Sequence, residues 1–165
     1  MEKLILSRIK EAFADSILEV ADFRDQLVCV ISKDDLLSIC RFLRDDQELE
    51  FNLLSCICAV DFLKRNPRFD VVYELYSINK NHRIRLKVRV NEGESLPSAT
   101  SIWSAANWHE REVFDLFGIT FDDHPDLRRI LMPDNYEGHP LRKDFPLTRE
   151  EVMFSHNLNR PPKIE

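Results

Sequence analysis

The sequence has 165 residues, of which 44% are hydrophobic and 32% are charged, and its formal net charge is −6. This length fits one domain, or one domain with a tail, and the hydrophobic fraction is large enough for a packed core. The acidic balance argues against nucleic acid as a partner, because phosphate binding needs a basic surface.

The first part of the chain predicts a helix, two strands and a second helix. Apolar residues at helical spacing indicate a short amphipathic helix over residues 3–14. Two apolar runs predict strands at 17–23 and 26–32. Ser32 and Asp35 resemble a capping box, so a second helix is expected from there to about Arg44.

Three further strands are predicted at 51–63, 69–78 and 82–90. The last one alternates regularly between apolar and basic residues, and Asn79 and Asn81 favour a hairpin before it. The predicted fold class is α+β, a two-layer sandwich with helices on one face of a mixed sheet. The basic side chains of the last strand form either a solvated face or a docking surface for an acidic partner, namely Arg83, Arg85, Lys87 and Arg89.

The character of the sequence changes after Pro97. One more helix is predicted at 101–117, ended by Gly118 as its C-cap. Six of the eight prolines lie at or beyond Pro125, and residues 119–165 have too few apolar residues for a core of their own. We therefore divide the chain into an α+β domain, 1–118, and an extended C-terminal arm, 119–165. The arm is expected to lie across another surface, its own or a partner's.

The motifs of common catalytic and metal sites are incomplete or missing in this sequence. His109-Glu110 begins like H-E-x-x-H, but Val113 stands where the second histidine is needed. The four cysteines lie among apolar residues and are predicted to be buried free thiols in a reducing compartment. No glycine-rich phosphate loop is present, and no apolar run is long enough to span a membrane. We assign no catalytic, metal-binding or cofactor-binding residue.

Several charged and aromatic residues between 103 and 124 keep two interpretations. Acid–base catalysis by Glu110, Glu112, Asp115 or His124 stays open, although Arg111 and Asp115 at i, i+4 spacing can simply pair along the helix. Trp103 and Trp108 are either packing residues or interface anchors.

The stretch from Asn107 to Leu147 resembles the signature of the C subunit of NADH-quinone oxidoreductase, the 30-kilodalton subunit family of respiratory complex I. The pattern E-R-E-x-x-D-x-[FY]-G-[IV] is present from Glu110 to Ile119. H-P-D-L-R-R-I-L follows from His124 to Leu131, and G-H-P-L-R-K-D-F-P from Gly138 to Pro146. The order of predicted elements before these motifs also fits the α+β domain of the family.

The resemblance implies a hydrophilic scaffold in the peripheral arm of a complex that transfers electrons from NADH to quinone. It implies no cofactor on this chain, while the complex uses FMN and iron–sulfur clusters. The implied partners are chiefly the D subunit and the subunit that holds the last cluster, at the cytoplasmic face of the bacterial inner membrane, with the membrane reached only through partners. A homologous subunit of a related membrane complex, either one that takes electrons from ferredoxin or a membrane-bound hydrogenase, remains an alternative.

Part of the resemblance concerns charged residues that we predict to form the partner interface. They lie on the predicted helix and on the arm, and they are Glu110, Arg111, Glu112, Asp115, His124, Arg128, Arg129, Arg142, Lys143 and Asp144.

Overall fold

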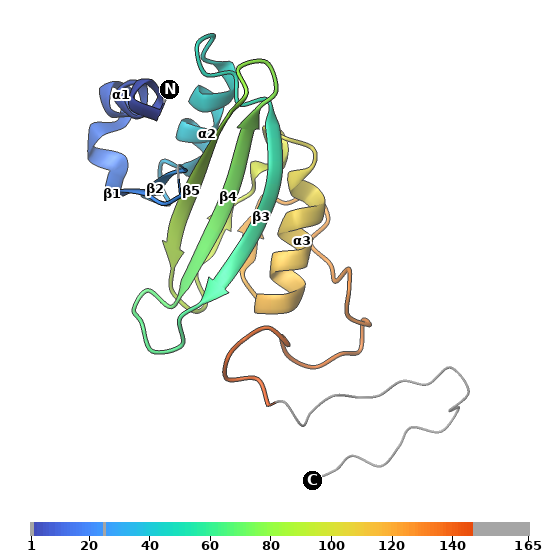
Figure 1. The fold of residues 1–165 in the computed structure, drawn as a ribbon. Helices are drawn as coiled ribbons and strands as arrows, with labels where there is room; N and C mark the ends of the chain where they lie inside the picture. Colours follow the sequence, from blue (N-terminus) through green and yellow to red (C-terminus); the bar gives the residue numbers. More distant parts are fainter. Residues whose placement is uncertain (1, 25, 147–165) are drawn as a thin grey trace.

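The computed structural model describes residues 2–24 and 26–146, and its centre is a five-stranded mixed sheet (Figure 1). The strands have the order β1-β2-β5-β4-β3, in which only β2 and β5 run parallel. Their bounds are β1 Ile17–Asp22, β2 Leu27–Ile31, β3 Leu53–Asp61, β4 Phe69–Ser77 and β5 His82–Val90. The five predicted strands and the α+β class are confirmed.

Three helices pack on one side of this sheet. They are α1 Glu2–Phe13, α2 Leu36–Asp45 and α3 Ala106–Phe117, and two short 3-10 turns, η1 Ala14–Ser16 and η2 Ala99–Ser101, precede β1 and α3. A separate two-stranded parallel sheet joins β6 Ser95–Pro97 to β7 Thr120–Asp122. The sequence did not predict this small sheet, because each strand has only three residues.

The core lies between the helices and the inner face of the sheet. Alternate residues of β5 are fully buried, as the pattern predicted, with Leu86 opposite Tyr73 and Val88 opposite Val71. On the outer face Arg85 forms an ion pair with Glu74, and Arg89 forms one with Glu19. Half of the basic face is therefore neutralised by neighbouring strands of the same sheet.

Two predicted helix starts are wrong. The carboxylate of Asp35 accepts a hydrogen bond from the Ser16 hydroxyl at 2.6 Å, and α2 has no side-chain cap, so Ser32 and Asp35 form no capping box. The helix expected from 101 begins at Ala106, because the Ser98 hydroxyl accepts the N–H of Thr100 and starts the 3-10 turn η2 instead. Local side-chain bonds of this kind compete with helix formation.

The two tryptophans and the cysteines divide between core and surface. Trp103 is buried and donates its indole N–H to the carbonyl of Phe51, whereas Trp108 is 61% exposed. All four thiols are free, and burial raises the pKa of Cys29 to about 11. Cys58 is exposed and Cys56 is only half-buried, so the prediction that every cysteine is buried is wrong for these two.

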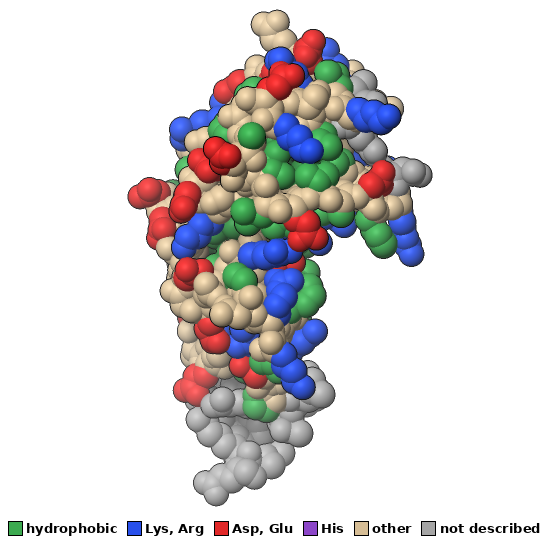
Figure 2. All heavy atoms as spheres, turned by 90° about the vertical axis from the view of Figure 1, so that its left-hand side faces the viewer, with side chains coloured by type: hydrophobic (Ala, Val, Ile, Leu, Met, Phe, Trp, Pro, Cys, Tyr) green, Lys and Arg blue, Asp and Glu red, His purple; other side chains and the backbone are tan. Residues whose placement is uncertain are grey.

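The face that α1 and β1 present carries uncovered apolar side chains. Figure 2 shows hydrophobic groups between acidic and basic ones on this side of the molecule. Four large apolar residues are exposed on α1, on β1 and in the turn after β1, namely Leu4, Leu18, Val20 and Phe23.

The arm begins in β7 and continues to Pro146 without a helix, lying beside α3 and the lower end of the sheet (Figure 1). Leu127 and Met132 pack against the core. The surface that orders this part of the arm therefore belongs to the chain itself. The boundary at residue 118 stays a prediction, and residues 147–165 of the arm lie outside the described part.

Gly118 ends α3 in the predicted C-cap role. Its φ is +73°, and its N–H donates to the carbonyl of Phe114 at 2.8 Å. A Cβ at this position would lie 2.5 Å from the ring of His139 and 2.7 Å from the guanidinium of Arg142. Glycine is required here for its backbone conformation and for the close approach of the arm.

We predict that Gly118→Ala lowers the free energy of unfolding more than Gly93→Ala does. Both glycines have positive φ, so both substitutions carry about 1–2 kcal/mol of backbone strain, but a Cβ at Gly93 meets nothing within 4 Å. The clash with His139 and Arg142 adds about 1–3 kcal/mol for Gly118→Ala alone. Urea unfolding of both variants measures the difference, and equal losses would contradict the close approach.

Candidate functional site

The residues predicted as a partner interface lie where α3 meets the arm, and most of them contact their own chain. Two carboxylates each accept several hydrogen bonds there. Asp115 accepts them from the arm, and Asp61 accepts them from the arm and from Arg68. The end of α3 is capped by arm side chains between them. These contacts fix the arm on the domain and leave a smaller set of residues facing solvent.

The Asp115 carboxylate is the first anchor. Its side chain has no solvent exposure, and Oδ2 accepts the backbone N–H groups of Ile130, Leu131 and Met132 at 2.8–3.0 Å. Oδ1 accepts from the Arg129 guanidinium at 2.6 Å. Burial alone would raise the pKa of Asp115, but the Met132 N–H, Arg129 and the other two N–H groups outweigh it and lower that pKa.

The Arg111 guanidinium binds the arm just before the residues that Asp115 holds. It donates to the carbonyls of Arg128 and Arg129 at 3.1 and 3.2 Å, and the residue is buried. The predicted pair between Arg111 and Asp115 along the helix is therefore wrong. The arm supplies carbonyl oxygens to the Arg111 guanidinium and N–H groups to the Asp115 carboxylate. Both side chains therefore bind the arm and not one another.

The arm also supplies donors to the last carbonyls of α3, which have no partner inside the helix. His139 Nδ1–H donates to the carbonyl of Asp115 at 2.9 Å, and the N–H of Leu141 donates to Leu116 at 3.1 Å. Arg142 donates to the carbonyl of Phe117 at 2.5 Å. A cation at a helix C-terminus is also favoured by the helix dipole.

Arg68 organises the second anchor, which the sequence did not reveal. The largely buried guanidinium binds both oxygens of Asp61 at 2.8–2.9 Å, Asp144 at 2.7 Å and Glu92 at 2.8 Å. Asp61 also accepts the N–H of Lys143 at 2.8 Å. The hydrogen bonds from Arg68 lower the pKa of Asp61, despite its burial. In the sequence, the only sign of this anchor is that a carboxylate, Asp61, stands at the end of an apolar strand.

Glu110 lies in a third, closed cluster. Its carboxyl accepts the Ser98 hydroxyl and the Ala99 N–H, each at 2.7 Å, and His124 Nε2 lies 3.9 Å from it. His124 Nδ1 accepts the N–H of Asp126, so the ring proton sits on Nε2. Burial raises the pKa of Glu110 to about 7, against the smaller opposing effect of its two donors.

Acid–base catalysis by these residues is not supported by the geometry. The Glu110 and His124 side chains have no solvent exposure, so no substrate reaches them in this fold. Glu112 is exposed and lies away from both of them, and Asp115 is occupied by four donors.

A few of the predicted interface residues remain exposed, together with apolar neighbours. Glu112, Arg128 and Lys143 face solvent, and Asp144 is exposed although it binds Arg68. Trp108 shares the outer face of α3 with Glu112 and lies over the Arg111 guanidinium, at 5.2 Å from ring centre to carbon. Leu131 on the arm is 55% exposed. We call Trp108, Glu112, Arg128 and Leu131 the α3–arm patch.

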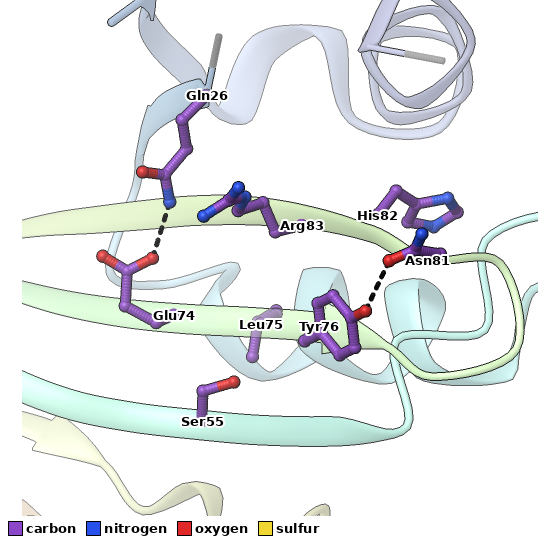
Figure 3. A pocket seen from close by; sticks show the side chains of 8 residues that line it. All are labelled: Gln26, Ser55, Glu74, Leu75, Tyr76, Asn81, His82 and Arg83. Carbon is purple, nitrogen blue, oxygen red and sulfur yellow. Dashed lines mark hydrogen bonds between the residues drawn. The ribbon is translucent and has the colours of Figure 1, made fainter. Parts of the chain in front are cut away.

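A surface hollow of about 460 Å³ lies elsewhere, at one end of the outer face of the sheet (Figure 3). Gln26 donates to Glu74 across it at 2.8 Å, and Tyr76 donates to Asn81 at 2.6 Å. Arg83 of the basic face of β5 lines this hollow, whereas none of the charged residues predicted on α3 and the arm does. Its polar groups largely bind one another, and it offers no cluster of reactive side chains.

Among the described residues, no group of three or more histidine, cysteine, aspartate or glutamate side chains is arranged to hold a metal ion. No helix within residues 2–24 and 26–146 is long and apolar enough to cross a membrane.

Comparison with known proteins finds consistent similarity. The family model described as respiratory-chain NADH dehydrogenase, 30 Kd subunit, matches residues 29–151. The C subunit of NADH-quinone oxidoreductase from Roseiflexus sp. (strain RS-1) is 52% identical over 157 residues, 94% of this chain and 90% of the relative. The protein of the same name from Geotalea uraniireducens (strain Rf4) is 50% identical over 141 residues, 85% of each chain.

A solved structure is similar as well. It is described as the trypsin-resistant fragment (1–134) of Nqo5, with a TM-score of 0.65 and 32% sequence identity. The match covers 77% of this chain and 100% of that fragment.

We predict that Asp115→Asn lowers the free energy of unfolding by about 3 kcal/mol at pH 7, because it removes one partner of a buried ion pair. The pKa of Asp115 is lower in the folded state, so its contribution is present above the unfolded pKa of about 4 and is lost as pH falls from there through the folded pKa. Urea unfolding at pH 7 and at acid pH measures both effects.

The matched control for this experiment is Glu112→Gln, which removes an exposed carboxylate from the same helix. It should change the free energy of unfolding by no more than about 0.5 kcal/mol. Trypsin should also cleave after Arg128 or Arg129 faster in Asp115→Asn than in the control. Similar stability and cleavage in the two variants would show that Asp115 does not anchor the arm.

We predict the opposite pH dependence for Glu110. Its folded pKa, about 7, is raised, so the stability it contributes is full below the unfolded pKa of about 4.5 and is lost as pH rises through 7. Glu110→Gln keeps a neutral acceptor and donor, so between pH 5 and 8 its free energy of unfolding should fall by about 2 kcal/mol less than that of the unsubstituted chain. Urea unfolding across this range measures the difference. Parallel pH profiles of the two proteins would rule out this role for Glu110.

Proposed function

The chain belongs to the 30 Kd subunit family of respiratory-chain NADH dehydrogenase, and from this premise we propose that it is a hydrophilic scaffold of the peripheral arm of the complex. NADH-quinone oxidoreductase is an enzyme complex, and this chain is one of its subunits. In this proposal the chain contributes no catalytic residue. It supports the transfer of electrons from NADH to quinone by holding neighbouring subunits in place.

The main support for this proposal is that the charged residues of the family motifs bind the arm and the end of α3. Asp115 and Arg111 both bind the arm backbone, and Arg129 and Arg142 bind a carboxylate and a helix end. Reactive side chains in an active site must reach a substrate. These side chains instead shape a fixed extended arm, which is a task of assembly.

The cofactors of the complex, FMN and iron–sulfur clusters, are in this proposal held by other subunits. The partners are other complex I subunits, chiefly the D subunit and the subunit that holds the last cluster. The complex lies at the cytoplasmic face of the bacterial inner membrane, and this chain reaches the membrane only through those partners. The names of the relatives favour NADH over ferredoxin or hydrogen as the electron source.

The α3–arm patch is the surface best suited to one of these contacts. Tryptophan and arginine contribute strongly to the binding energy of protein interfaces. Trp108 is backed by the Arg111 guanidinium, and Leu131 is held by its N–H on Asp115, so both exposed side chains are placed on a rigid support. A rigid apolar surface loses little conformational entropy on binding.

We predict that the double substitution Trp108→Ala with Leu131→Ala lowers the amount of assembled complex in membranes about tenfold, while NADH oxidation per assembled complex is unchanged. The loss of two interface side chains weakens docking but touches no reacting group. Native gels of mild-detergent extracts, with the chain tagged, measure assembly. Activity in the excised band measures turnover.

The control is Ile78→Ala, which removes a side chain that is also 61% exposed but lies at the turn between β4 and β5. It should leave assembly unchanged. Full assembly with a collapse of turnover in the double variant would restore a catalytic role. If the tagged chain itself migrates alone near 19.5 kDa, the proposed function is wrong.

A further inference from the structure

The two edges of the central sheet differ in how they are protected. The outer strand β3 packs against α3, but no described residue pairs with the outer side of β1 (Figure 1). Every residue of β1 after Ile17 is exposed. An open edge strand presents unpaired N–H and C=O groups that can pair with another strand.

The hydrogen-bond register shows which backbone groups of β1 are unpaired. Phe23 and Gln26 exchange both of their N–H···O bonds, at 3.1 and 3.2 Å, and so form a hydrogen-bonded pair. Such pairs alternate with non-bonded ones along an antiparallel ladder. In the observed register Ala21 is therefore bonded to Val28, while Val20 and Asp22 direct their N–H and C=O groups to the open edge.

The side chains of this edge do not oppose pairing. Leu18 and Phe23 are 59% and 57% exposed, and Val20 between them is also exposed. Residues 17–22 contain no proline and no lysine, which commonly protect edge strands from pairing. The register shift between Ile17 and Glu19 interrupts the strand at its start and leaves the segment from Glu19 to Asp22 regular.

The charge of the edge indicates what kind of strand would bind. Three acidic residues lie on β1 or in the turn before it, namely Asp15, Glu19 and Asp22. The two arginines beside them already have partners within the chain, because Arg89 binds Glu19 and the Arg24 guanidinium lies over the Phe23 ring. A second copy of this chain would bring two acidic edges together, and each copy carries a net charge of −6. Opposite charges across paired strands are favourable and like charges are not.

We propose that β1 is a docking strand that accepts an extended, basic segment of another subunit as a sixth strand of the sheet. The apolar residues of that segment cover Leu18, Val20 and Phe23, and its basic residues face Asp22 and Glu19. Backbone pairing gives affinity in this mode, and the side chains give specificity. The inference rests on the proposed function, since it requires that the chain is assembled with other subunits.

Hydrogen–deuterium exchange tests the pairing directly. The purified complex and the purified full chain are compared, with exchange followed in peptides covering residues 17–24. The amides of Val20 and Asp22 should exchange at least about 100-fold more slowly in the complex, because only pairing on the open edge protects them. Equal exchange in the two samples, with the chain present in the complex, overturns the docking strand and leaves the proposed function intact.

Two substitutions test it independently. Val20→Pro removes an N–H from the open edge without removing a hydrogen bond to β2, whereas Ala21→Pro, its matched control, removes one that holds β1 to β2. Val20→Pro should lower the fraction of chain in the complex about tenfold and leave the melting temperature of the isolated chain within about 2 °C, while Ala21→Pro should lower that temperature clearly. Assembly of Val20→Pro at the unsubstituted level overturns the inference.

If Val20→Pro fails to fold, Leu18→Lys takes its place, with Ile78→Lys as a control of similar exposure in the turn between β4 and β5. Leu18→Lys should reduce assembly about tenfold and Ile78→Lys should not. A photoreactive side chain at Leu18 in the purified complex then identifies the occupant. Cross-linking to a basic segment of another subunit is expected, and cross-linking to a second copy of this chain contradicts the proposal.

Discussion

The carboxylate of Asp115 is the interaction on which the rest of the site depends. A buried carboxylate without donors is strongly destabilising, and α3 alone provides none for it. The arm brings the N–H groups of residues 130–132 and the Arg129 guanidinium to this one group. The arm has no core of its own and cannot hold its shape alone, while α3 cannot bury this charge alone. Each therefore requires the other, and the buried charge fixes the register of a segment that has no helix to define its path.

The sequence predicts those parts of the fold in which local pattern and tertiary packing agree. β5 is predicted well because its alternating residues also face the core, and Gly118 because only glycine relieves both the positive φ and the contact with His139. It fails where a local interaction competes with a distant one. Asp35 has the sequence of a helix cap but binds Ser16, and the i, i+4 pair of Arg111 with Asp115 is replaced by partners 14–18 residues away on the arm.

The candidate site was predicted as a set of residues but not as a set of contacts. The motif residues do lie together at the α3–arm junction, yet their positions could not reveal that most of them bind their own chain. Arg68 was missed because its partners are far away in sequence: Asp144, for example, follows 76 residues later. A single arginine between two strands gives no periodic or motif signal. Only the fold shows that it joins the end of β3 to the end of the described arm.

The molecule is consequently asymmetric in how its edges are closed. On the side of β3, helix α3 and the arm cover the sheet, and Arg68 and Asp115 use charge to lock the arm in place. On the side of β1, backbone groups, apolar side chains and acidic residues stay open to solvent. In the proposed scaffold, the α3–arm patch and the open edge of β1 are two docking surfaces at opposite edges of one sheet. Two subunits docked at these surfaces would be held at a distance set by the width of the sheet, which is how the proposed scaffold would position its neighbours.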